Sequence, residues 1–280
     1  MTTNNNSYSS SVGTILTMIG VAVGLGNVWR FPYMMGNYGG SAFVLIYLVF
    51  TLLLAFPALL TEMYLGKNNP SGTIGAYEFL YGSTLGRVLG YLFITVVTIA
   101  GSYYAVIVAN VIFSAYFSIT TGFSTEQNPN YQTLLGNGYL QYGITIALVS
   151  AALFVSYKGL KNGIEKISKV IMPFFCIAII YMIIHAWQLP GAQEKVKAFI
   201  RPDFSAITST EIFAALGQAF YSVGLGGTFV VVYASYIADR KDIPRIAILT
   251  CLGDLGASLL VSLFLVPTIL VLGMLSLIHI

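Results

Sequence analysis

Val23-Gly24-Leu25-Gly26-Asn27 lies near the middle of the first long apolar run of this sequence, which covers residues 13 to 35. A second segment of the same kind, Val223-Gly224-Leu225-Gly226-Gly227, lies near the middle of the apolar run 211 to 237. Glycine destabilises a helix interior by about 1 kcal/mol relative to alanine. Paired glycines in the middle of both runs therefore predict two helices that are interrupted there.

The composition indicates what surrounds these helices. Of the 280 residues, 57% are hydrophobic and 8% are charged, whereas soluble domains carry about 25% charged residues. Several apolar runs also exceed the roughly 18 residues that mark a membrane-spanning helix. The sequence therefore predicts an all-α, polytopic membrane protein in contact with the lipid bilayer. Its net charge of +3 is small and spread over short loops, which does not favour a nucleic-acid partner.

Seven apolar runs approach or exceed the length that crosses a bilayer. They cover residues 13–35, 42–65, 88–121, 138–156, 167–188, 211–237 and 246–278. The first run is not a cleavable signal, because no positive segment precedes it. Nine Lys or Arg residues lie in the loops after the second, fourth and sixth runs, and three lie after the third and fifth. This asymmetry predicts a multi-pass protein of the plasma membrane with a cytoplasmic N terminus.

The two interrupted runs are five spans apart, so the second would enter the membrane in the opposite direction to the first. Paired interruptions in inverted halves indicate a substrate site at the membrane midplane of a secondary transporter. Close helix packing through small residues is the alternative explanation for either glycine pair alone. We expect a single transmembrane domain over 1–280, with a first repeat over 1–188 and the start of a second over 189–280.

Several motifs resemble the neurotransmitter:sodium symporter family, in its bacterial amino-acid type. They are Gly20-Val-Ala-Val-Gly-Leu-Gly-Asn-Val-Trp-Arg-Phe-Pro32, Asn37-Tyr-Gly-Gly-Ser-Ala-Phe43, Pro57 with Glu62, Tyr103-Tyr104, Gly217-Gln-Ala-Phe-Tyr-Ser222 and Tyr233-Ala-Ser-Tyr236. The resemblance implies a five-plus-five inverted-repeat fold with helices 1 and 6 broken at mid-membrane. Members of the family have more helices, so we expect this chain to hold the first seven and to be truncated at its C terminus.

The function implied by the resemblance is sodium-coupled symport of a neutral amino acid, without enzymatic activity. The implied substrate-binding residues are Gly24, Leu25, Gly26, Tyr104, Tyr221, Ser222, Gly224 and Gly227. The substrate carboxylate would meet the amides of Leu25 and Gly26 and the hydroxyl of Tyr104, because the N-terminal end of a half-helix attracts an anion. Gly24 stands where relatives that carry monoamines have an acidic residue, which favours an amino acid as cargo. Gly224 and Gly227 would leave space for a bulky side chain.

Sodium is the implied cofactor, at two sites. The first site would use the Ala22 carbonyl and the side chains of Asn27, Ser222 and Asp254, together with the substrate carboxylate. The second would use the carbonyls of Gly20 and Val23 with ligands from an eighth helix. Freed carbonyls and short polar side chains supply the oxygen ligands that a hard cation prefers.

Chloride is not expected as a cofactor. Tyr47, Gln218, Ser222 and Ser258 match the positions that form a chloride site in some relatives. Asp254, however, supplies a permanent negative charge beside the first sodium site, and a second anion nearby would be repelled.

Ionisable residues inside spans are functional by default, and here they are Arg30, Glu62 and Asp254. By resemblance, Arg30 and Gln218 form an extracellular gate with an acidic partner on a tenth helix. The alternative for Arg30 is a side chain that extends to the outer membrane interface. Glu62 resembles a carboxylate that accepts hydrogen bonds from the amides of the broken helices, which is a structural support of the site.

Three other functions are alternatives to transport by an intact symporter. An inactive truncated fragment is the first. An ion channel would show a pore loop or rings of polar residues. An intramembrane enzyme needs a nucleophile with a base, or paired acids, and neither His185 nor His279 has such a partner in the sequence. Cys176 and Cys251 lie in apolar runs and are expected to be small core residues. The sequence predicts no oligomeric state.

Overall fold

The computed structural model describes residues 7–122, 129–202, 204, 207–226, 228–239 and 242–273. Within these ranges the chain is helical and contains no strand. Gly227, one of the predicted substrate residues, lies outside the described residues.

The first apolar run forms two helices that meet at an angle. Helix α1 (Ser11–Ala22) begins at Ser10, whose side chain accepts a hydrogen bond from the amide of Gly13. The helix continues beyond residues 23–25 as a π-helical turn, η1 (Gly26–Arg30), and then as α2 (Phe31–Asn37). The two arms are bent by 58° at this break. The chain therefore leaves the helix where the first glycine pair lies.

The sixth apolar run is also divided. Helix α11 (Ser209–Ser222) starts at a capping box of Thr208 and Glu211, and α12 (Phe229–Ser235) follows after a six-residue gap. Gly224 and Gly226 have φ angles of 73° and 74°, which favour glycine. Thr228 has a φ of 64°, an unusual value for a β-branched residue. Strained backbone of this kind is often found at functional sites.

The remaining spans are long helices. Five helices of the described residues are long and apolar enough to cross a membrane, and the bent first pair counts as a sixth. The five are Ser41–Asn68 (α3, Ser41–Phe50; η2, Thr51–Ala55; α4, Phe56–Asn68), α6 (Ser83–Thr120), α8 (Gly138–Tyr157), Leu160–Trp187 (η3, Leu160–Ile164; α9, Glu165–Trp187) and α13 (Ile243–Leu272). The protein is thus a multi-pass membrane protein.

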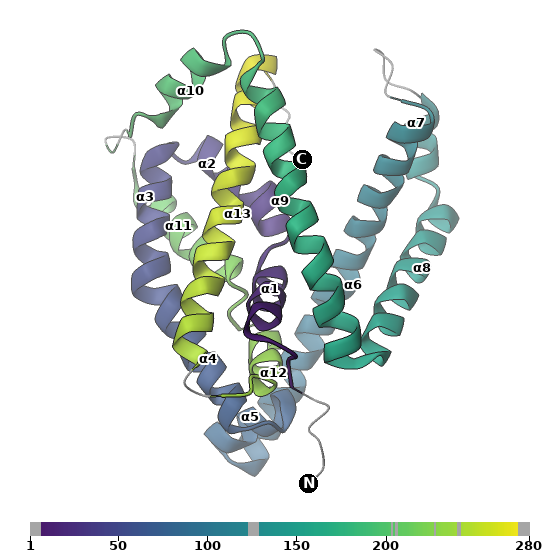
Figure 1. Cartoon of the computed structure of the whole chain (residues 1–280), viewed down its shortest axis with the longest axis vertical. Helices are drawn as coiled ribbons and strands as arrows, with labels where there is room; N and C mark the ends of the chain where they lie inside the picture. Colours follow the sequence, from purple (N-terminus) through teal and green to yellow (C-terminus); the bar gives the residue numbers. More distant parts are fainter. Residues whose placement is uncertain are drawn as a thin grey trace.

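Three short helices lie between the spans: α5 (Gly72–Tyr81), α7 (Pro129–Leu135) and α10 (Ala192–Ile200). Helix α10 crosses the upper end of the molecule in Figure 1. It is fixed at both sides, because the Ser41 hydroxyl donates to the Ile200 carbonyl at 2.7 Å and the Lys195 amine donates to the Leu270 carbonyl at 2.7 Å.

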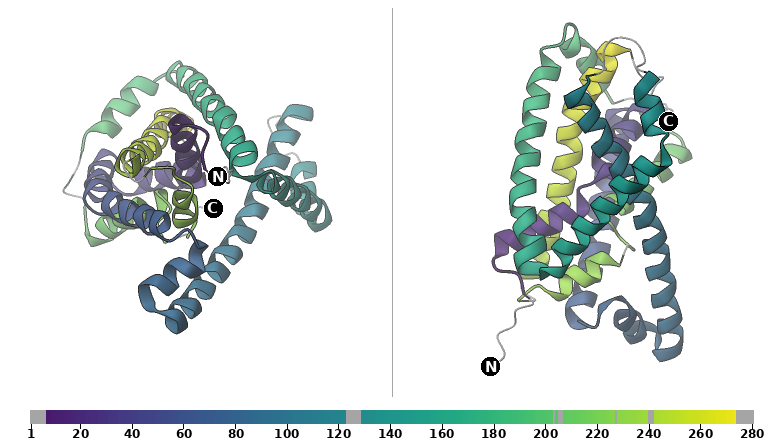
Figure 2. Two further views of the ribbon diagram at one scale, coloured as in Figure 1. Left: turned by 60° about the horizontal axis from the view of Figure 1, so that its bottom comes forward. Right: turned by 90° about the vertical axis from the view of Figure 1, so that its right-hand side faces the viewer.

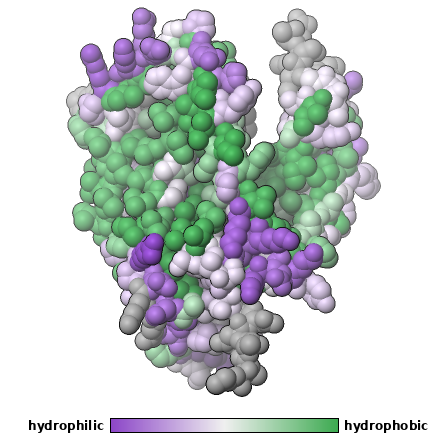
Figure 3. Space-filling model, viewed as in Figure 1, coloured by the Kyte–Doolittle hydropathy of each residue, from purple (hydrophilic) through white to green (hydrophobic). Residues whose placement is uncertain are grey.

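The core of the molecule surrounds the two breaks. Figure 2 shows α1, α3, α4, α12 and α13 close together, whereas α6 and α8 extend away from this bundle. Phe31, Phe43, Tyr47 and Leu59 are among its largest buried side chains. In Figure 3 a hydrophobic band crosses the middle of the visible face, and hydrophilic side chains gather above and below it. This is the pattern of a surface that faces lipid between two aqueous sides.

The N-terminal segment is attached to the first turn of α9. The buried carboxylate of Glu165 accepts a hydrogen bond from the Ser9 amide at 2.8 Å and another from the Ser9 hydroxyl. Lys169 completes the group, with its amine 2.6 Å from Glu165 Oε1 and 3.0 Å from Ser9 Oγ. A Cβ atom on Gly13 would lie 1.8 Å from Glu165 Oε1, so a larger residue there would push the Glu165 carboxylate aside.

Candidate functional site

The first break exposes backbone groups that find partners at the site. The amides of Asn27 and Val28 both donate to the Gly24 carbonyl, at 3.1 and 3.2 Å. The side-chain oxygen of Asn27 accepts from the Gly24 amide at 2.9 Å. The Leu25 amide donates to the hydroxyl of Tyr104 on α6, at 3.2 Å. Two of the predicted substrate residues, Leu25 and Tyr104, are therefore in direct contact.

A buried polar cluster lies beside this break, around Asp254 of α13. The Asn27 amide nitrogen donates to Asp254 Oδ1 at 2.6 Å, and the Ser222 hydroxyl donates to Asp254 Oδ2 at 2.7 Å. Ser258 Oγ lies 2.9 Å from the Asn27 nitrogen, and the Tyr47 hydroxyl lies 3.5 Å from Asp254 Oδ2. Asp254 itself is 0% exposed. A buried carboxylate persists only with such partners.

The oxygen atoms of this cluster are suitable ligands for a small hard cation. Asp254, Ser222 and Asn27 offer carboxylate, hydroxyl and amide oxygens and bring one negative charge, which are the ligands that such cations prefer. No group of three or more His, Cys, Asp or Glu residues that could hold a metal occurs in the described part of the chain. Asn27 turns its NH2 group toward Asp254 and its oxygen toward Gly24. The side-chain amide of Asn27 must therefore rotate before its oxygen can bind a cation in this cluster.

A cavity of about 530 Å³ separates the two breaks from α6. Its lining residues are Gly20, Val21, Ala22, Val23, Gly24, Leu25, Gly26, Val97, Ala100, Gly101, Tyr104, Tyr221, Ser222, Gly224 and Phe229. Every predicted substrate residue within the described ranges is in this set, as are Gly20, Ala22 and Val23 of the two predicted sodium sites. The lining contains no charged side chain.

Phe229 also lines this cavity, and the sequence did not indicate it as a site residue. A Cβ atom on Gly224 would lie 2.4 Å from Cε2 of the Phe229 ring. The space predicted beside Gly224 is therefore occupied by this ring. No local sequence pattern indicates that the chain turns back across the break and brings residue 229 next to residue 224. On the opposite wall, a Cβ atom on Gly101 would meet nothing within 4 Å.

The two residues of the predicted gate have different neighbours in the structure. The Arg30 guanidinium lies over the ring of Tyr221, with Cζ 4.5 Å from the ring centroid, which is a cation–π contact. Gln218 donates instead to the Gly26 carbonyl at 3.4 Å. Among the described residues no hydrogen bond joins Arg30 to Gln218. Tyr221 also packs on the first break, because a Cβ atom on Gly26 would lie 2.9 Å from its Cε1 atom.

Glu62 of α4 reaches the second break. Its Oε1 atom accepts a hydrogen bond from the Gly226 amide at 2.8 Å. Its Oε2 atom is buried and has no hydrogen-bond partner in the described residues. The carboxylate thus contacts a free amide of a broken helix, which is the arrangement that the resemblance implies.

Comparison with known proteins assigns the family. Residues 5–135 and 130–278 match the family described as "Sodium:neurotransmitter symporter family". The chain is 30% identical over 270 residues to an uncharacterized sodium-dependent transporter of Bacillus subtilis, covering 95% of this chain and 60% of the relative. It is 32% identical over 266 residues to an uncharacterized sodium-dependent transporter of Methanocaldococcus jannaschii, covering 91% of this chain and 54% of the relative.

A solved structure gives the same result. The crystal structure of MhsT in complex with L-phenylalanine superposes with a TM-score of 0.84 at 30% identity, covering 96% of this chain and 62% of that one. The chain thus spans little more than half the length of these relatives. Over that length the family match and the structural likeness agree: the chain belongs to the sodium:neurotransmitter symporter family, whose members are transporters and not enzymes.

Proposed function

We propose that the full-length protein is a sodium-coupled symporter that carries a neutral amino acid across the plasma membrane, with its N terminus in the cytoplasm. The observation that carries this proposal is the cavity of about 530 Å³ that is bordered by both helix breaks, by Tyr104 and by Ser222. Broken helices at membrane depth bind substrate and ions in secondary transporters.

The cavity suits the carboxylate and the neutral side chain of an amino acid. The substrate carboxylate would bind the amides of Leu25 and Gly26 and the hydroxyl of Tyr104, at the N-terminal end of the η1 half-helix. Gly24 and the other lining residues carry no charge, so they offer no partner for a charged side chain. A charged side chain would pay a high desolvation cost in this cavity.

The proposed first sodium site consists of the Ala22 carbonyl, Asn27, Ser222 and Asp254. Sodium bound there would supply a positive charge beside the substrate carboxylate, which couples the two. Asp254 balances that charge, and Ser222 fixes the Asp254 carboxylate by its hydrogen bond of 2.7 Å. Gly20 and Val23 would contribute carbonyls to a second site. Chloride is not required, because Asp254 already provides an anion.

The proposed cargo has a bulky apolar or aromatic side chain. Val97, Ala100 and Gly101 are small residues on the α6 wall of the cavity, and the aromatic Phe229 also lines it. Aromatic rings pack favourably against one another at such walls. MhsT, the related protein, has been crystallised with L-phenylalanine, which supports this choice.

Uptake into proteoliposomes tests the proposal. The full-length protein should accumulate labelled phenylalanine when sodium is outside, and uptake should vanish when potassium replaces sodium. Unlabelled leucine and tryptophan should compete better than glycine and alanine. Equal uptake in both salts would refute the coupling to sodium, and strong competition by glycine would refute the choice of a bulky cargo.

A further inference from the structure

Helix α4 contacts the second half of the broken sixth span at three successive points. Glu62 accepts the hydrogen bond from the Gly226 amide, before α12 begins. Gly66, one helical turn later, packs directly on the α12 backbone, since a Cβ atom there would lie 2.0 Å from the Val231 carbonyl oxygen. Lys67 then donates from its amine to the Ile237 carbonyl, just beyond the end of α12. Glu62 and Gly66 lie one helical turn apart on the same side of α4, and Lys67 follows directly after Gly66.

Helix α12 needs such support because it is short. It contains seven residues, and isolated helices below about 12 residues are marginal in water. It also follows a strained approach, with positive φ angles at Gly224, Gly226 and Thr228. The last carbonyls of the helix already accept hydrogen bonds from the Ser235 hydroxyl and from the amides of Tyr236 and Ile237, so Lys67 adds a contact just beyond the helix, and its positive charge lies near the negative end of the helix dipole.

The contact at Gly66 limits how far the two helices can separate or slide. A backbone-to-backbone approach of this kind is possible only with glycine. Since the close contact involves the Val231 backbone and not a flexible side chain, a larger residue at position 66 would displace α12 itself. The close contact at Gly66 therefore helps to fix the position of α12 against α4.

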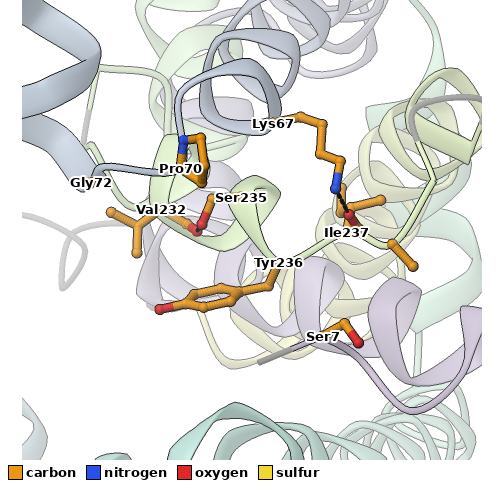
Figure 4. A pocket seen from close by; sticks show the side chains of 9 residues that line it. Ser7, Lys67, Pro70, Gly72, Val232, Ser235, Tyr236 and Ile237 are labelled. Carbon is orange, nitrogen blue, oxygen red and sulfur yellow. Dashed lines mark hydrogen bonds between the residues drawn. The ribbon is translucent and has the colours of Figure 1, made fainter. Parts of the chain in front are cut away.

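Lys67 reaches its acceptor beside a second cavity, of about 540 Å³, which Ser7 also lines. Figure 4 shows Lys67 bound to Ile237, with Ser235 and Tyr236 of the same segment lining the cavity. The cavity also contacts Ser7, Pro70 and Gly72. Water can therefore reach the lysine charge from this side, and the segment that the lysine holds borders the opening.

We propose that the C-terminal part of α4 holds α12 in place, an arrangement that we call a splint. Lys67 is the positioning residue, because it binds the Ile237 carbonyl just beyond the C-terminal end of α12. Lys67 touches neither substrate nor sodium. It acts through α12, which carries Phe229 at one end, in the substrate cavity, and Ile237 just past the other. The expected effect of this arrangement on transport rests on the proposed function. Loss of the Lys67 contact should let α12 move away from α4 and open the cytoplasmic end.

Three variants of the full-length protein test the splint. Lys67→Met removes the donor and keeps the length of the side chain, whereas Lys67→Arg restores a charged donor. Lys161→Met is the matched control, because this exposed lysine lies at η3, away from α12. In Lys67→Met the sodium concentration for half-maximal uptake should rise about tenfold, the equivalent of roughly 1.4 kcal/mol. Lys67→Arg and Lys161→Met should stay within about twofold of wild type.

A labelling experiment measures the position of α12 without any transport. Ser235→Cys places a thiol on the cavity wall, in a background where the exposed Cys176 is serine and the buried Cys251 is kept. A membrane-impermeant maleimide added to inside-out vesicles should react about tenfold faster with this thiol when Lys67→Met is present. The Lys67→Arg and Lys161→Met controls should leave the rate unchanged.

The two measurements separate the possible failures. Unchanged labelling and an unchanged sodium requirement in Lys67→Met overturn the splint, and so does a changed requirement with unchanged labelling. If the wild type shows no sodium-dependent uptake, the proposed function fails, and the labelling rates still decide whether Lys67 holds α12. If Lys67→Met does not reach the membrane, Lys67→Leu, which also removes the donor, takes its place with the same expected direction.

Discussion

The Leu25 amide donates a hydrogen bond to the Tyr104 hydroxyl across 3.2 Å, which joins the first helix break to α6. Figure 2 shows α6 extending away from the central bundle, so this contact connects two parts of the molecule that otherwise pack little. Tyr104 remains 40% exposed toward the cavity. Its hydroxyl is therefore held at the break while it remains accessible to a ligand.

Tyr104→Phe should weaken substrate binding. The change removes the hydroxyl that would donate to the substrate carboxylate and leaves the ring in place. A hydrogen bond to a charged group contributes about 1.5 to 3 kcal/mol, so the KM for phenylalanine should rise at least about tenfold. Tyr103→Phe is the matched control, because Tyr103 is 71% exposed and does not line the cavity. Uptake curves for the two variants that coincide would contradict this role of Tyr104.

Gly101→Val should reduce the volume available to the substrate side chain. Nothing lies within 4 Å of a Cβ atom at Gly101, so the new side chain fits the fold and projects into the cavity. Overpacking costs about 1 to 3 kcal/mol, so competition by phenylalanine should weaken by about tenfold, while competition by alanine should not. Gly143→Val on α8 is an equally open control site outside the cavity. Equal losses for both competitors would indicate a general defect and not a smaller pocket.

Glu165→Ala should release the N-terminal segment. The Ser9 amide and hydroxyl and the Lys169 amine all lose their shared acceptor. Tyr8, which is 8% exposed, should then become a site of chymotrypsin cleavage, at a rate at least about tenfold higher. Mass spectrometry of the released N-terminal peptide measures this rate. Glu194→Ala, at an exposed acid on α10, is the control, and an unchanged rate in Glu165→Ala would show that Glu165 does not hold the segment.

Hydropathy predicted seven spans, because lipid-facing helices must be apolar over a bilayer's thickness. Within the described residues, six of them are helices or a bent helix pair long and apolar enough to cross a membrane, whereas the run 211–237 is divided into the shorter helices α11 and α12. Hydropathy missed α5, α7 and α10, which are short and lie between the spans. Helix α10 carries Lys195 and Lys197 beside buried Ala192 and Val196, so its average hydropathy is low. Its position depends on Ser41 and on the Leu270 carbonyl, and no local pattern encodes these distant partners.

The candidate site could be predicted only where the chemistry is encoded by residue type. Asn27 and Asp254 are 227 positions apart, and a hydrogen bond of 2.6 Å joins them. The resemblance placed both residues in one sodium site, whereas their spacing in the sequence could not predict that they are neighbours. Side-chain directions were not predictable, since they depend on packing. Phe229 occupies the space beside Gly224, and Arg30 lies over Tyr221 and does not bond Gln218. The positions of both side chains depend on the backbone turn at the helix break, which the residue types alone do not specify.

Asp254→Asn should make transport depend on chloride. The Asp254 carboxylate is fully buried and is held by Asn27 and Ser222. A chloride ion about 4 Å away would be repelled by roughly 4 kcal/mol at an effective dielectric of 20, so the wild type should take up substrate equally well when gluconate replaces chloride. Asparagine removes the charge and keeps the shape, and a mobile anion near Tyr47 and Ser258 would then balance the sodium charge. Uptake by Asp254→Asn should therefore fall at least about tenfold in gluconate and recover in chloride. Ser258→Ala, which leaves the carboxylate intact, should remain independent of chloride. Loss of wild-type uptake in gluconate would show that Asp254 does not replace the anion.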